Sequence, residues 1–210
     1  MNAQTEKLQL HGAAGVIDAL RDAPPAGVTP RGVAVIAHPH PLFGGTMDNK
    51  VVQTLARAFV GAGWTAVRFN FRGVGASEGV HDEGGGEAED MLAVVQQVAP
   101  NGPLSIAGFS FGAFVAINAL QTLWGSREVE RVALVGASVA RVPPPALPLD
   151  SHDRVLMVHG EQDDTVALAA VMDWARPQSL PVTVVPGGGH FFHGQLPLLK
   201  NLVARHLRPG

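Results

Sequence analysis

Short apolar runs recur along the chain, each bounded by glycine, proline or polar residues. Two near the amino terminus, residues 8–12 and 15–20, partly alternate apolar and polar residues around a glycine-containing turn, which predicts a hairpin. Six further runs rich in β-branched residues are predicted to be strands: 33–36, 65–69, 104–107, 132–135, 155–158 and 182–185.

Helical periodicity fills most of the gaps between these strands. The predicted helices are residues 49–61, 87–98, 111–124, 167–175 and 195–207. Strands that alternate with helices favour an α/β fold with a mainly parallel sheet covered on both faces. Residues 142–148 are few and rich in proline, so they leave no room for a helical lid, and the glycine triplet at 84–86 indicates a flexible surface loop.

Composition narrows the class of protein. A chain of 210 residues with 46% hydrophobic residues suits one globular domain spanning 1–210. Residues 91–126 contain no Asp, Glu, Lys or Arg, yet the turn sequence at 100–103 divides them into a strand and a buried helix, which argues against a membrane span. The amino-terminal residues 1–7 lack a basic segment followed by an apolar core, so we expect no signal peptide and a cytoplasmic protein.

Charge and cysteine content exclude several functions. The net charge of −3 and the absence of a basic cluster argue against nucleic-acid binding and favour a small-molecule partner. The chain has no cysteine, which excludes a thiol nucleophile, a disulfide framework and any cysteine-ligated metal. Oligomeric state is left open by these features.

The most informative motif is G-x-S-x-G at residues 108–112, with Ser110 at its centre. It follows a predicted strand and precedes a predicted buried helix, the context in which such a serine is exposed at a sharp turn. A serine nucleophile needs a general base and an orienting carboxylate. Asp163 and His190 both follow predicted strands, and the chain order Ser110, Asp163, His190 fits this requirement.

These features together resemble the α/β-hydrolase superfamily, and small bacterial members without a lid in particular. The likeness extends from the hairpin to the last helix, and its motifs are residues 37–45, 70–75, 108–112, 160–163 and 189–192. The resemblance implies a mostly parallel sheet with an antiparallel amino-terminal hairpin and helices on both faces. It also implies that Ser110 is the nucleophile, His190 the general base and acid, and Asp163 the carboxylate that orients the imidazole.

Alternatives stay open at two of these positions. Asp164 is adjacent to Asp163, and His193 stands three residues after His190. One oxyanion donor is expected to be the backbone N–H of Phe111, at the start of the helix. Since Pro39 and Pro41 have no N–H, the second donor must be His40 or Leu42, and we favour His40.

Other chemistries fit less well. His38 and His40, with His190 and His193, suggest a metal site, but the chain has no H-E-x-x-H or carboxylate-bridged pattern, so no metal or other cofactor is expected. The glycines at 73, 75 and 79 match a dinucleotide fingerprint poorly.

We therefore expect a serine hydrolase that cleaves small carboxylic esters or thioesters through an acyl-enzyme. Amide or peptide hydrolysis on the same residues is the first alternative. A noncatalytic protein that binds a ligand on the same fold is the second.

Overall fold

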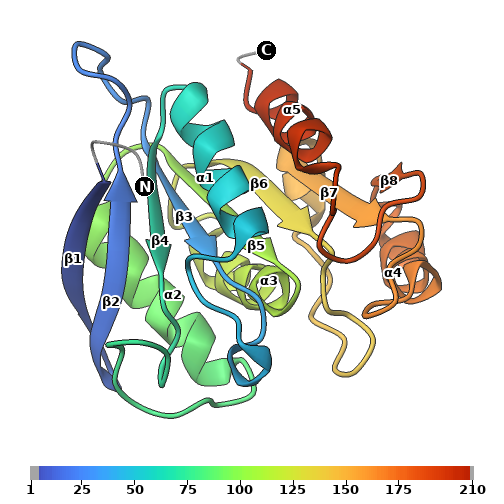
Figure 1. Cartoon of the computed structure of the whole chain (residues 1–210), viewed down its shortest axis with the longest axis horizontal. Helices are drawn as coiled ribbons and strands as arrows, with labels where there is room; N and C mark the ends of the chain where they lie inside the picture. Colours follow the sequence, from blue (N-terminus) through green and yellow to red (C-terminus); the bar gives the residue numbers. More distant parts are fainter. Residues whose placement is uncertain (1–4, 209–210) are drawn as a thin grey trace.

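The computed structural model describes residues 5–208. Its strands are β1 (Thr5–Gly12), β2 (Gly15–Asp22), β3 (Val33–Ala37), β4 (Thr65–Phe69), β5 (Leu104–Phe109), β6 (Val129–Val135), β7 (Val155–Gly160) and β8 (Val182–Val185). Within residues 5–208 these eight strands form one sheet in the order β1-β2-β4-β3-β5-β6-β7-β8 (Figure 1). β2 pairs antiparallel with both β1 and β4, whereas all neighbours from β4 to β8 are parallel.

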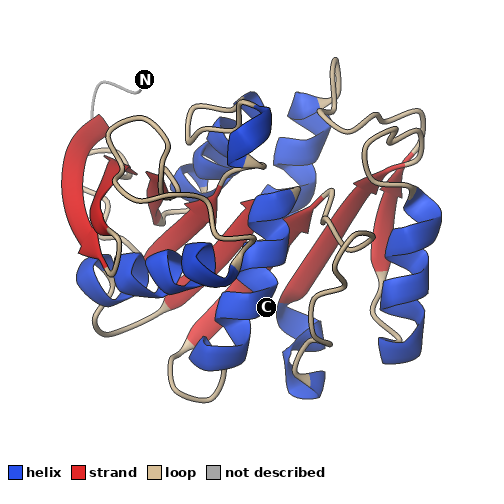
Figure 2. Ribbon diagram, turned by 90° about the horizontal axis from the view of Figure 1, so that it is seen from below, coloured by secondary structure: helices blue, strands red, loops and turns tan. Residues whose placement is uncertain are grey.

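Helices cover both faces of the sheet (Figure 2). They are α1 (Lys50–Gly61), α2 (Gly85–Val98), α3 (Phe111–Leu123), α4 (Leu168–Ala175) and α5 (Leu196–His206). The apolar sides of α2, α3 and α4 pack in one core cluster, and those of α1 and α5 pack in a second cluster on the opposite face. This is the α/β-hydrolase architecture expected from the sequence, and the fold class is confirmed.

The uncharged segment 91–126 includes β5, a strand in the middle of the helix-covered sheet. All six residues of β5 are buried, because the strand has β3 and β6 as neighbours and helices on both faces. Parallel strands covered in this way become apolar throughout. Among the described residues, no helix combines the length and the apolarity needed to cross a bilayer.

The predicted element boundaries agree with the structure to within three residues, with the largest differences at the starts of β1 and β6, but the glycine triplet was misassigned as a loop. Gly85 and Gly86 form the first turn of α2, and Gly84 is its N-cap with a φ of 106°. A Cβ at Gly84 would overlap the ring of Phe114, and one at Gly86 would overlap the guanidinium of Arg72. The glycines therefore permit close packing at the start of α2, and they do not form the flexible surface loop that the sequence predicted.

The segment between β6 and β7 contains no α-helix, and its short 3-10 helix covers Leu149–Arg154. Residues 136–148 follow the carboxyl end of β6 as a loop without helix or strand. The expectation of a chain without a lid domain holds across the described residues.

Candidate active site

Ser110 lies at the junction of β5 and α3, where the backbone reverses direction within one residue. Its φ of 56° and ψ of −117° are a rare combination for a residue with a side chain. Gly108 and Gly112 allow it, because a Cβ at Gly108 would overlap the Gly112 carbonyl and one at Gly112 would overlap the Ala37 carbonyl. The backbone N–H of Ser110 donates to Val135 O at 2.8 Å, which fixes the turn against the end of β6.

Three side chains from distant parts of the sequence meet at this turn. His190 Nε2 lies 2.9 Å from Ser110 Oγ, and His190 Nδ1 lies 2.7 Å from Asp163 Oδ2. Because an ionised carboxylate only accepts, Nδ1 carries a proton and Nε2 is free to accept the hydroxyl proton of Ser110. All three residues are buried, with exposed fractions of 7% for Ser110, 4% for His190 and 7% for Asp163. The geometry is that of a serine, a base and an orienting acid.

Asp163 is held as an anion by its surroundings. Burial opposes its ionisation, but hydrogen bonds from His190 and from the backbone N–H groups of Val166 and Thr165 outweigh burial and lower the pKa of Asp163. Oδ1 accepts both backbone bonds and Oδ2 faces the imidazole. The side chain is therefore fixed in position and charge.

The neighbouring candidates lie elsewhere. Asp164 is exposed, and its carboxylate accepts from the hydroxyl of Thr165. His193 is also exposed and contacts the ring of Phe191, at 6.0 Å between ring centroids. In this geometry the structure brings Asp163, and not Asp164, to His190.

His159, near the end of β7, also lies close to the carboxylate of Asp163. Its Nε2 lies 2.8 Å from Val166 O and 3.5 Å from Asp163 Oδ2. Burial is the main cause that lowers the pKa of His159. A carbonyl oxygen only accepts, so Nε2 carries the proton and the neutral ring supports the Asp163 turn.

The two residues expected to donate to an oxyanion, Phe111 and His40, line the same cavity as Ser110. The Phe111 N–H opens α3 and, like the His40 N–H, has no hydrogen-bond partner within the described part of the chain. The Leu42 N–H differs, because it donates to His40 Nδ1 at 3.3 Å in the 3-10 turn η1 (Pro41–Phe43). Because the Leu42 N–H is already used in this hydrogen bond, His40 is the better candidate for the second oxyanion donor.

His38 holds this loop in place and does not face the cleft. It is completely buried; its Nδ1 lies 2.6 Å from Pro39 O and its Nε2 accepts from the Phe71 N–H at 3.0 Å. Burial lowers the pKa of His38 to about 4. Both ring nitrogens are therefore occupied, and residues 5–208 contain no group of three His, Asp or Glu side chains arranged as metal ligands.

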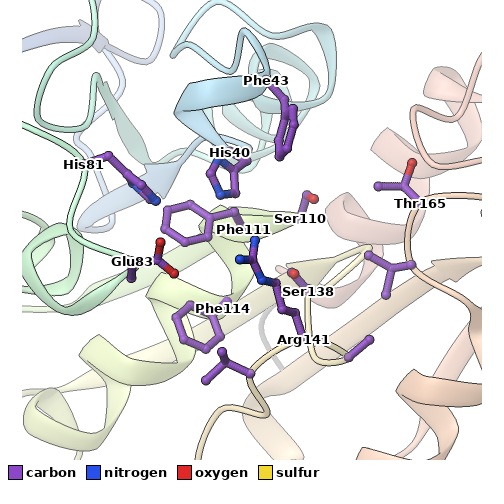
Figure 3. A pocket seen from close by; sticks show the side chains of 13 residues that line it. His40, Phe43, His81, Glu83, Ser110, Phe111, Phe114, Ser138, Arg141 and Thr165 are labelled. Atoms are coloured by element: carbon purple, nitrogen blue, oxygen red, sulfur yellow. The ribbon is translucent and has the colours of Figure 1, made fainter.

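Several residues that line the cavity at Ser110 were not predicted from the sequence. Figure 3 shows His81, Glu83, Ser138 and Arg141 around a cavity that also contains Ser110. Their only sequence signal is that the segments carrying them follow the carboxyl ends of β4 and β6, the edge of a parallel sheet where ligands bind.

Comparison with known proteins places the chain among hydrolases. Residues 29–155 match the family model described as serine aminopeptidase, S33. An uncharacterized protein of Rickettsia prowazekii is 31% identical in an alignment that covers 76% of this chain and 71% of that protein.

Solved structures agree with these matches. A serine hydrolase without a lid from Xanthomonas campestris is 34% identical, with a TM-score of 0.83 over 99% of this chain and 95% of its own. An α/β serine hydrolase homologue from Coxiella burnetii is 36% identical, with a TM-score of 0.80 over 97% of both chains. From its fold and these matches, the chain belongs to the serine aminopeptidase S33 family of the α/β-hydrolase superfamily.

Proposed function

We propose that this member of the family hydrolyses carboxylic esters or thioesters of small molecules through an acyl-enzyme on Ser110. The observation that supports the proposal most directly is the continuous hydrogen-bond chain from Ser110 through His190 to Asp163. In a hydrolase, this arrangement activates the serine hydroxyl as a nucleophile. A thiol nucleophile is excluded because the chain has no cysteine.

In the first half-reaction, Ser110 Oγ attacks the ester carbonyl while His190 Nε2 takes the hydroxyl proton. The new Oγ–C bond forms, the bond to the leaving group breaks, and His190 returns the proton to the departing oxygen or sulfur. Water then attacks the acyl-enzyme, gives a proton to His190 and releases the acid, while Ser110 Oγ regains that proton. Every proton is moved by Ser110, His190 or water, so the proposed reaction needs no cofactor.

The negative charge on the carbonyl oxygen during each attack is stabilised by the free N–H groups of Phe111 and His40. The Phe111 N–H also lies at the positive end of α3. A single donor of this kind contributes about 3 to 4 kcal/mol to the transition state.

Amide hydrolysis on the same residues is the competing activity, and the family description as a serine aminopeptidase favours it. The cleft beside Ser110 is not covered by a lid domain in the described residues, which suits small esters more than the selection of a peptide terminus. Matched esters and anilides of one acyl group separate the two activities. We expect the ester to be cleaved with the larger kcat/KM after correction for the uncatalysed rates.

The decisive test is covalent labelling by a fluorophosphonate, read by intact mass and compared with ester turnover. Wild type should gain one adduct, Ser110→Ala none, and His190→Ala an adduct only slowly. Turnover should fall about 10³- to 10⁶-fold in both variants. Full ester turnover in Ser110→Ala excludes the proposal, and an unlabelled but folded wild type favours the noncatalytic binding protein.

A further inference from the structure

Two cavities meet at Ser110 and have different walls. The first has a volume of about 230 Å³ and includes His81, Glu83, Phe114 and Arg141. The second has a volume of about 360 Å³ and includes Asn49, His190 and Phe191. His40, Phe43 and Thr165 line both cavities, as does Ser110 itself, so a substrate that reaches the hydroxyl can extend into each of them.

The proposed reaction assigns these cavities to the two halves of the substrate. His190 must protonate the leaving group, and of these two cavities it lines only the second. The leaving group therefore occupies the cavity beside His190 and the acyl group occupies the cavity beside Arg141. The described lining of the leaving-group cavity contains no Asp, Glu, Lys or Arg, which suits a neutral alcohol or thiol.

Arg141 gives the acyl cavity a positive charge that no group in residues 5–208 neutralises by direct contact. Among the described residues it has neither an ion pair nor a hydrogen bond, whereas Arg68 is bound by Asp22 and Arg72 by Asp90. Arg141 is an exposed residue that lines the cavity, and Figure 3 shows its guanidinium among the side chains around it. A planar guanidinium with free N–H groups is suited to bind a carboxylate with two hydrogen bonds.

The rest of the cavity provides a path from Ser110 to this charge. Phe111 and Phe114 are stacked, with ring centroids 5.9 Å apart, and form an apolar wall for a short methylene chain. On another side, His81 Nδ1 is bound to the buried carboxylate of Glu87 at 2.7 Å. His81 Nε2 has no partner among the described residues, so the ring adds a second polar group to the cavity.

Resting on the proposed function, we propose that the enzyme prefers esters whose acyl chain ends in a carboxylate, with Arg141 as the specificity-determining cation. The substrate class is a monoester of a linear dicarboxylic acid with a neutral alcohol. Glu83 lines the same cavity with the opposite charge, so it weakens the binding of such an anion and limits the preference.

The test compares 4-nitrophenyl hydrogen adipate with 4-nitrophenyl hexanoate, which differ only in the carboxylate at the end of a six-carbon acyl chain. Wild type should cleave the adipate with the larger kcat/KM. Arg141→Gln should lower the adipate value about tenfold or more, mainly through KM, and change the hexanoate value less than about twofold. Arg141→Lys should keep part of the preference, and Glu83→Gln should increase it.

Arg205→Gln is the matched control, because it removes one exposed positive charge from α5 and should leave both substrates unchanged. Equal effects of Arg141→Gln on adipate and hexanoate, or a reduced preference in Glu83→Gln, would overturn the assignment. Loss of both activities in Ser110→Ala tests the proposed function separately, whatever the result at Arg141.

A binding measurement is independent of turnover. Monomethyl adipate should bind calorimetrically to the Ser110→Ala variant and bind at least about tenfold more weakly when Arg141→Gln is added, whereas methyl hexanoate should show no such change. Absence of adipate binding to the folded Ser110→Ala variant, or equal affinity in the double variant, excludes Arg141 as the anion site even if neutral esters are cleaved.

Discussion

Gly112 lies directly against the carbonyl oxygen of Ala37, so the first turn of α3 and the end of β3 are in backbone contact. A Cβ at Gly112 would overlap that oxygen and would also lie 2.5 Å from His38 O. Because both expected oxyanion donors lie within two or three residues of this contact in the sequence, we expect the contact to set the distance between the His40 and Phe111 amides.

Gly112→Ala should therefore separate α3 from β3 and reduce both stability and activity. We expect a loss of about 1 to 3 kcal/mol in the free energy of unfolding, as for other overpacked sites, and a larger relative loss in kcat than in KM. Gly61→Ala is the matched control, because Gly61 is also helical and a Cβ there would meet nothing within 4 Å.

At Gly61 alanine should stabilise the protein by about 0.5 to 1 kcal/mol. Urea unfolding and steady-state kinetics measure both variants. Wild-type activity in Gly112→Ala would show that the α3–β3 contact does not govern the donors.

Asp163→Asn should lower kcat about 10⁴-fold, because an amide in place of the carboxylate favours the wrong tautomer of His190. Asp164→Asn should change kcat less than about twofold, since Asp164 is exposed and contacts Thr165. Steady-state kinetics on one ester measures both. Comparable losses in the two variants would contradict the assignment of Asp163.

His40→Ala should lower kcat about tenfold, because the Leu42 N–H then loses its acceptor and the loop that presents the His40 amide is less well fixed. His40→Asn should recover most of the loss, since an asparagine side chain accepts from the backbone N–H two residues later. The rate of fluorophosphonate labelling provides a second readout. Equal loss in both variants would indicate that the imidazole acts in another way.

Protonation of His38 should destabilise the fold in acid. Because burial lowers its pKa from 6.5 to about 4, the unfolded chain binds a proton more readily than the folded protein does. The stability that neutral His38 contributes is complete above pH 6.5 and is lost as the pH falls toward 4, by about 3 kcal/mol.

His38→Gln should be less stable at neutral pH and should lack this part of the pH dependence. Urea titrations at pH 7 and pH 4.5 compare the two proteins, and the difference between them isolates His38 from His159 and His206, whose pKa values are also lowered. Parallel pH profiles for both proteins would refute the assignment.

The amino-acid sequence by itself determined the order and type of the elements, because the periodicity of apolar residues reports which faces are buried. It also indicated Ser110, because the G-x-S-x-G motif demands a particular backbone, and it indicated Asp163 and His190, which follow predicted strands in a chain order that resembles the α/β-hydrolase superfamily. The elements and the serine motif are local properties, and a local pattern suffices to predict them. The glycines at 84–86 show where this reasoning fails, because their packing partners, Phe114 and Arg72, are not their neighbours in the sequence.

Only the tertiary structure decided which groups face one another. Ser110 and His190 are 80 residues apart in the chain and meet because β5 and β8 end at the same edge of the sheet. Three features depend on side-chain direction and distance. They are the contact of Asp163 with His190, the hydrogen bond of the Leu42 N–H, and the guanidinium of Arg141, which has no partner within residues 5–208. Those quantities are fixed by the packing of several elements at once, and no segment of the sequence specifies them alone.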